Sequence, residues 1–387
     1  MVKYLFFRKK SKKKPVFLEI IKLEIDALMP QKFSTYLDVV RFAAALFVFL
    51  GHAAGMSWTG GFLWQIGAYA DTCVVVFFVL SGFVIAYVTD AKEHSWQIYA
   101  ASRISRIWSV AIPALLLTFL IDSIGVRVAP ELYLGQAWYA GDRPLLRYVT
   151  SFFMLHEVWH LKLVPGINAP FWSLSFEVFY YFAFGVIFYS KNKLRFLIAA
   201  LLMAIAGPLI AALFPIWWLG YIAYKQTRQM NTSRVASFGY FFAGLFIILL
   251  SPYIRSLDSS GLQVLGESVI GRYCDAIGFY LNLIGAYGLS RFGKPLSKYT
   301  YFAISSMAST TFALYLFHRP LIQFFSYIGP NDPASFVRRI LVIGGTLIIV
   351  FALSPLCERL RIIFRQRLFA LLECRKSRIN LNKELEA

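Results

Sequence analysis

Hydrophobic residues in this chain fall into blocks of about twenty residues, the length that an α-helix needs to cross the hydrocarbon core of a bilayer. Short polar segments separate these blocks. The pattern predicts about ten membrane-spanning helices, near residues 35–55, 70–90, 107–125, 171–190, 195–212, 215–224, 235–252, 275–290, 301–327 and 337–356. The sixth block is short, and we leave open whether it spans the membrane fully.

The composition agrees with this pattern. Hydrophobic residues make up 58% of the 387, and charged residues make up only 15%, against roughly a quarter in soluble domains. We therefore expect an all-α membrane protein with a basic N-terminal segment at 1–34, a membrane domain at 35–356 and a basic tail at 357–387. Residues 16–29 interleave apolar and charged positions, which predicts an amphipathic helix on the membrane surface.

Most of the 39 Lys and Arg residues gather in alternate loops and at the two ends of the chain. Because short cytoplasmic loops collect positive charge, this pattern places both termini in the cytoplasm. Arg338 and Arg339 are exceptions, because this orientation places them in an outer loop, where the charge rule expects few basic residues. The net charge of +19 then reflects loops that face anionic lipids, and it does not indicate a nucleic-acid partner.

Metal and disulfide chemistry find no support in the sequence. His156 and His160 are four residues apart but have no third ligand at a plausible spacing, so we expect no metal. The four cysteines, at 73, 274, 357 and 374, imply no disulfide framework.

The first predicted span contains both Arg41 and His52. Ionisable residues are costly inside a bilayer, and they usually serve function there. The two residues are eleven positions apart, which places them on nearly the same helix face and about 16 Å apart along the axis. The alternative is that Arg41 reaches the cytoplasmic headgroups and His52 bonds a neighbouring carbonyl.

Arg103 and Arg106 lie three residues apart at the cytoplasmic start of the third span. Guanidinium groups suit phosphates because they offer paired donors and keep their charge. These two arginines are candidates for binding a nucleotide-bearing cofactor, and ordinary anchoring at the membrane surface is equally compatible with them.

A further polar group begins the fourth span, where Trp172, Ser173 and Glu177 occur in WSLSFE. Glu177 enters the outer leaflet at the depth of His52, and we expect it to orient that imidazole or hold a hydroxylated substrate. An ion pair with Arg319 is the alternative. Ser81 and Gly82 in the second span suggest close helix packing.

The ninth span carries Tyr315, His318 and Arg319 next to Pro320, which frees a backbone carbonyl. We expect these residues to line the same cavity as His52. His318 is the weaker catalytic candidate of the two histidines, because a neighbouring arginine disfavours its protonation.

In this order, LDVVRFAAALFVFLGHA, FFVLSGFVI, RISR, FWSLSFEVFYY and LYLFHRP resemble the acyltransferase 3 family of bacterial membrane O-acyltransferases. The chain departs from that pattern at Phe176, Val178, Phe317 and Arg319. The resemblance implies a multi-pass enzyme of the bacterial inner membrane. Such an enzyme would move an acyl group, usually acetyl from cytoplasmic acetyl-CoA, onto a hydroxyl of a cell-envelope or exported glycan, free or lipid-linked.

This resemblance suggests roles for the candidate residues. His52 would act as general base or form an acyl-histidine, with Glu177 orienting it. Arg41, Arg103 and Arg106 would bind the donor, and Trp172, Ser173, Tyr315, His318 and Arg319 would bind the acceptor. The oligomeric state stays open, a homo-oligomer included. The competing hypotheses are a secondary transporter of a sugar, lipid-linked glycan or proton-coupled solute, and a membrane sensor or scaffold.

Overall fold

The computed structural model describes residues 29–257, 263–264, 267–292 and 296–385, with side chains up to residue 372 apart from those of residues 263 and 267. The first part of the described chain, up to Tyr189, forms α2 Gln31–Ala53, α3 Met56–Thr59, α4 Trp64–Gly67, α5 Ala70–Lys92, α6 Trp96–Val128, η1 Pro130–Leu132, α7 Pro144–Phe152, η2 Val158–His160, η3 Ala169–Phe171 and α8 Trp172–Tyr189. The remaining elements are α9 Arg195–Ala206, α10 Pro208–Gln229, α11 Arg234–Leu249, α12 Ser251–Leu257, β1 Gln263–Val264, β2 Glu267–Ser268, α13 Ile270–Ser290, α14 Lys298–Ser309, α15 Thr311–Ile328, α16 Phe336–Ile340, η5 Leu341–Gly345 and α17 Thr346–Leu385.

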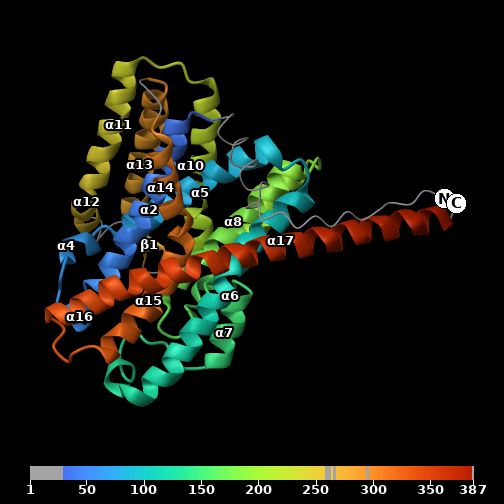
Figure 1. The fold of residues 1–387 in the computed structure, drawn as a ribbon. Helices are drawn as coiled ribbons and strands as arrows, with labels where there is room; N and C mark the ends of the chain where they lie inside the picture. Colours follow the sequence, from blue (N-terminus) through green and yellow to red (C-terminus); the bar gives the residue numbers. More distant parts are fainter. Residues whose placement is uncertain (1–28, 258–262, 265–266, 293–295, 386–387) are drawn as a thin grey trace.

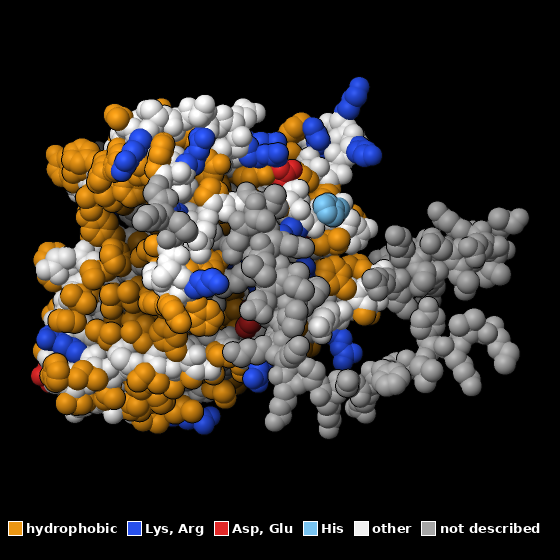
Figure 2. Space-filling view, turned by 45° about the horizontal axis from the view of Figure 1, so that its top comes forward, with side chains coloured by type: hydrophobic (Ala, Val, Ile, Leu, Met, Phe, Trp, Pro, Cys, Tyr) orange, Lys and Arg blue, Asp and Glu red, His pale blue; other side chains and the backbone are white. Residues whose placement is uncertain are grey.

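The predicted all-helical architecture is confirmed (Figure 1), apart from the two-residue strands β1 and β2, which form a small antiparallel pair. The predicted amphipathic helix falls almost entirely outside the described residues. Hydrophobic side chains cover large parts of the molecular surface (Figure 2), as expected for a protein in contact with lipid.

Among the described residues, five helical segments are long and apolar enough to cross a membrane. They are 31–53, 70–92, 96–128, 169–189 and 336–372. A sixth candidate is the pair α11 and α12, which is bent by 52°. The other predicted blocks also form helices, but these are shorter or more polar. By length and hydropathy, the described residues therefore contain fewer candidate spans than the ten predicted.

Two predicted helix boundaries differ from those observed. The break between the fifth and sixth blocks occurs at Gly207, whose φ of 102° is accessible mainly to glycine. Pro208 then begins α10, where its fixed φ suits a first helical turn. The predicted span 301–327 is divided between α14 and α15, which meet at Thr310. Hydropathy does not register the break at Gly207, because its flanking residues remain apolar, whereas serines and threonines at 305, 306, 309, 310 and 311 surround the second break.

Helices α5 and α10 pack closely through two glycines. A Cβ atom on Gly82 would lie 2.0 Å from the Trp217 carbonyl oxygen, and one on Gly220 would lie 2.0 Å from the Val79 carbonyl oxygen. Small residues permit such close backbone contact between membrane helices. The packing role predicted for Gly82 is therefore confirmed.

The last helical run continues well past the predicted end of the final span. Helix α16 passes through the π-helical turn η5 directly into α17, which reaches Leu385. Figure 1 shows α17 crossing the bundle and continuing beyond it as a long helix. The segment predicted as a tail at 357–387 thus begins inside a helix that packs against α6 and α15.

Arg338 and Arg339 have internal partners. Arg338 is 4% exposed and donates hydrogen bonds to the carbonyl oxygens of Ser57, Trp58, Pro330 and Asn331. Arg339 donates to the Thr59 carbonyl. These bonds join α16 to the segment after α2, which explains why two arginines stand where the charge rule does not expect them.

Candidate functional site

A cavity of about 600 Å³ lies between α2, α5, α6, α8, α14, α15 and α17. Five residues predicted as site residues line it, namely Arg41, Arg106, Ser173, Glu177 and Tyr315. Ser81, Tyr181, Glu358 and Arg361 also line it, and the sequence had not indicated these four as site residues. Arg41 lines the cavity, whereas His52, which we expected to share a cavity with it, does not.

Three arginines contribute to the cavity wall, namely Arg41, Arg106 and Arg361. Arg41 forms a 2.7 Å ion pair with Asp38, one turn earlier on α2. Arg106 has no hydrogen-bond or ion-pair partner for its side chain among the described residues. The positive charges of Arg106 and Arg361 lie close enough to act on Arg41. This part of the cavity is therefore suited to bind an anion.

Glu177 lies in the wall with two hydroxyl groups. Ser81 Oγ donates to Glu177 Oε1 at 3.1 Å, and the Tyr181 hydroxyl donates to the same oxygen. Within the described part of the chain, Glu177 makes no hydrogen bond to His52 and no ion pair with Arg319. The predicted Glu177–His52 contact is absent. Ser81, which we expected to serve close helix packing, also faces the cavity and bonds Glu177.

His52 and His318 stack on each other, with ring centroids 5.2 Å apart and planes at 30°. His318 is fully buried, and its Nδ1 lies 2.9 Å from the Leu314 carbonyl oxygen. A carbonyl only accepts, so Nδ1 carries the hydrogen and, in the neutral ring, Nε2 carries a lone pair. That Nε2 has no partner among the described residues. His52 is partly exposed, and its side chain makes no hydrogen bond to any described residue. The alternative that His52 bonds a neighbouring carbonyl is therefore not found among these residues.

Tyr315 links the cavity to this imidazole pair. Its hydroxyl lies 2.9 Å from Ser173 Oγ, and its ring centroid lies 6.3 Å from that of His318. Neither His52 nor His318 lines the cavity itself. Seven of the predicted site residues therefore form two adjacent groups, with Arg41, Arg106, Ser173, Glu177 and Tyr315 in the cavity wall and His52 and His318 beyond Tyr315.

Arg319 and Trp172 lie outside the cavity wall. The Arg319 guanidinium carbon lies 4.5 Å from the centroid of the Trp58 ring, and the residue is 4% exposed. Its Nη1 has no partner among the described residues, and its charge acts on buried Asp122. Trp172 packs against Phe176, with ring centroids 5.0 Å apart.

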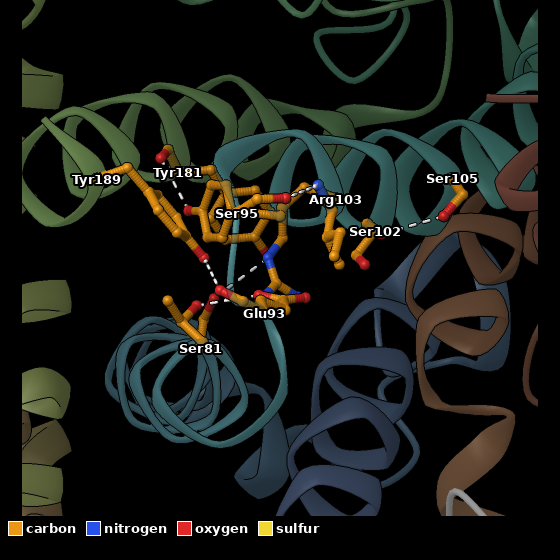
Figure 3. Close-up of polar contacts among 11 residues, drawn as sticks. Ser81, Glu93, Ser95, Ser102, Arg103, Ser105, Tyr181 and Tyr189 are labelled. Carbon is orange, nitrogen blue, oxygen red and sulfur yellow. Dashed lines mark hydrogen bonds and ion pairs between the residues drawn. The ribbon is translucent and has the colours of Figure 1, made fainter. Parts of the chain in front are cut away.

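Arg103 makes a buried ion pair instead of facing the cavity. Its Nη2 lies 2.6 Å from Glu93 Oε2, which also accepts from Thr89 Oγ1 at 3.0 Å. Figure 3 shows Arg103 and Glu93 pointing toward one another, with Tyr181 and Tyr189 beside them. The Tyr189 hydroxyl donates to the Glu93 backbone oxygen at 2.6 Å. Arg106 alone of the predicted arginine pair reaches the cavity, a difference that their three-residue spacing did not reveal.

The loop histidine His156 is structural. It is fully buried, and its Nε2 donates to the Phe171 carbonyl oxygen at 2.8 Å. Burial lowers the pKa of His156 to about 4. No group of three metal-ligating side chains occurs in the part of the chain that the structure describes.

Comparisons with known proteins bear on the chemistry of these residues. A family model described as an acyltransferase domain matches residues 34–355. Acyltransferase MdmB of Streptomyces mycarofaciens is 34% identical over 152 residues, which cover 38% of this chain and 36% of that protein. The matched part of the chain thus spans about a third of the length of this curated relative. No solved structure gives a significant match.

Proposed function

This chain belongs to the acyltransferase 3 family, and from that premise we propose that it transfers an acyl group, most simply acetyl, from cytoplasmic acyl-CoA to a glycan hydroxyl. The acceptor would be a glycan of the cell envelope, or one that is exported or carried on a lipid. The family match supports an acyltransferase and gives no support to the transporter, sensor or scaffold hypotheses.

One observation carries the proposal: a single cavity has arginines in its wall and is also lined by Tyr315, whose ring lies beside His318 of the stacked imidazole pair. Arg41 and Arg106 suit the phosphates of a coenzyme A donor, because guanidinium groups bind phosphate oxygens through paired hydrogen bonds. The apolar residues of the same cavity wall, which include Phe77, Phe78 and Val84, suit the pantetheine arm and acyl chain.

In this mechanism His52 acts as general base. It takes the proton of the acceptor hydroxyl as that oxygen attacks the thioester carbonyl. The new ester C–O bond forms and the C–S bond breaks, and the coenzyme A thiolate leaves as the thiol by taking that proton from His52. An acyl-histidine, in which His52 attacks first, is the alternative route.

The contacts suggest revised roles for two other residues. His318 would position His52 through the ring stack, since the bond to Leu314 fixes its own orientation. Glu177, held by Ser81 and Tyr181, would bind substrate in the cavity instead of orienting His52.

The test is transfer of labelled acetyl from acetyl-CoA to envelope glycan by membranes that contain equal amounts of each variant. We expect His52→Ala to lower the rate by roughly a hundredfold or more, the usual contribution of a general base. Arg41→Ala should raise the KM for acetyl-CoA with a smaller effect on kcat. His94→Ala, in an exposed loop, is the matched control and should transfer at the wild-type rate.

Wild-type transfer by His52→Ala would refute the mechanism. If the wild-type protein forms no acylated product from acetyl-CoA with any envelope glycan fraction, the proposed function is wrong. Solute uptake or export without an acyl product would revive the transporter hypothesis.

A further inference from the structure

Helix α17 contributes one face to the cavity wall. Ser354, Cys357, Glu358 and Arg361 all line the cavity. Spacings of three and four residues place these side chains on the same side of a helix. Arg359, between them in sequence, is exposed and does not line the cavity. Arg361 is thus oriented toward the cavity because it lies on the same face of α17 as Ser354, Cys357 and Glu358.

Arg361 adds a third guanidinium to those of Arg41 and Arg106. Helix α17 packs along α6, the helix that carries Arg106, and the charge of Arg361 acts on Arg41. Arg41 and Arg361 each pair with a carboxylate one turn away, Asp38 and Glu358, whereas Arg106 has no such partner among the described residues. A ligand with more than one phosphate can therefore bond Arg106 and the remaining donors of the other two guanidinium groups.

The existing partner of Arg361 is easily replaced. Arg361 Nη2 lies 2.6 Å from Glu358 Oε1, and both side chains are 42% exposed. An exposed ion pair of this kind contributes little stability. The pair uses one of the five N–H donors of the guanidinium, and a phosphate can form two parallel bonds to the same group.

Building on the proposed function, we propose that Arg361 binds a phosphate of the acyl-CoA nucleotide, and that Glu358 holds the Arg361 side chain at the cavity when the donor is absent. The site would thus combine α2, α6 and α17, with Arg41, Arg106 and Arg361 around the phosphates. A lipid headgroup phosphate is the other source of the same chemistry, and the experiment separates the two sources.

The test measures equilibrium binding of coenzyme A and of pantetheine, which lacks phosphates, to the purified full-length chain in phosphatidylcholine nanodiscs. We expect Arg361→Gln to weaken coenzyme A binding roughly tenfold, the effect of losing a charge-assisted hydrogen bond, and to leave pantetheine binding unchanged. Arg359→Gln is the matched control from the opposite face of α17, and it should bind both ligands as the wild type does.

Glu358→Gln distinguishes a binding role from a structural one. If Arg361 binds phosphate, Glu358→Gln frees its guanidinium and coenzyme A binds at least as tightly as to the wild type. If the ion pair only supports the fold, Glu358→Gln and Arg361→Gln weaken binding of both ligands equally, and the inference is wrong.

Two other outcomes would also overturn the inference. Unchanged coenzyme A binding by Arg361→Gln, with less phosphatidylglycerol retained on purification, assigns Arg361 to lipid and leaves the proposed function intact. A folded wild-type protein that binds no coenzyme A refutes both the inference and the proposed donor.

Discussion

At the scale of single residues, the arginines of this protein differ in what surrounds the guanidinium group. Arg103 and Arg338 are buried and bonded to protein oxygens. Arg106 lines the cavity without a partner among the described residues, and Arg361 lines it with a half-exposed partner. Buried, satisfied arginines stabilise structure, whereas partly free ones in a cavity are available to a ligand.

The first prediction concerns Arg338, which bonds four backbone carbonyls. Arg338→Met should lower the free energy of unfolding by about 3 kcal/mol or more, because buried carbonyls lose charge-assisted bonds. The thermal unfolding midpoint of the purified protein measures this change.

Arg339→Met removes one such bond, to the Thr59 carbonyl at 3.1 Å. It should therefore lower the midpoint much less than Arg338→Met. Equal midpoints for the two variants would contradict the structural role of Arg338.

Residue spacing predicted part of the site and missed contacts between distant segments. Arg41 and Glu177 stood out because ionisable residues are rare in apolar blocks, and both line the cavity. Glu93 and Glu358 had no such signal, since they lie in segments that read as polar loop and tail. The partner of Arg103 could not be inferred from the sequence. Glu93 follows α5 directly, and only the turn of the chain between α5 and α6 brings it next to Arg103.

At the scale of helices, the contact between α5 and α10 depends on the absence of side chains at Gly82 and Gly220. Gly82→Ala would place a methyl group against the Trp217 carbonyl and force the helices apart. We expect a loss of about 1 to 3 kcal/mol in the free energy of unfolding, the usual cost of overpacking, measured as a lower thermal unfolding midpoint.

Gly239→Ala is the control, because a Cβ there meets nothing within 4 Å. It should leave the midpoint unchanged or raise it slightly, since alanine favours a helix over glycine. A Gly82→Ala protein as stable as Gly239→Ala would show that α5 and α10 can separate without cost.

The helices themselves were predictable, and the places where they break were less so. Every predicted block contains a helix because length and hydropathy are properties of the local sequence. The break at Gly207 depends on a positive φ, which hydropathy does not register. The division at Thr310 lies in a stretch rich in serine and threonine, which the prediction of one span at 301–327 did not use.

At the scale of the whole molecule, the cavity arginines and several basic loops lie at one end. Lys32 at the start of α2 bonds the Phe292 carbonyl, and Arg291 bonds the Met230 carbonyl. At the other end of α2, Trp58 packs on Trp138 with centroids 5.3 Å apart. The prediction that both termini are cytoplasmic therefore assigns the arginine end of the cavity to the cytoplasm.

Cysteine labelling in intact cells tests this orientation, in a background where the native cysteines are replaced by alanine. Asn231→Cys should react with a membrane-impermeant maleimide only after the membrane is opened. Leu134→Cys, at a position that is 58% exposed, should react in intact cells. The reverse pattern would place the donor-binding end outside and exclude a cytoplasmic donor.

The π turn at Leu341–Gly345 has a consequence for everything that follows it. A π turn holds one residue more than an α turn and so sets the rotational phase of the helix beyond it. Each further residue turns an α-helix by about 100°. Deleting a single residue between this turn and Ser354 would move Arg361 to the position of Leu360, which does not line the cavity, and would move Arg359 to the cavity-lining position of Glu358. The π turn, a few turns before Arg361, therefore determines which arginine of α17 faces the cavity.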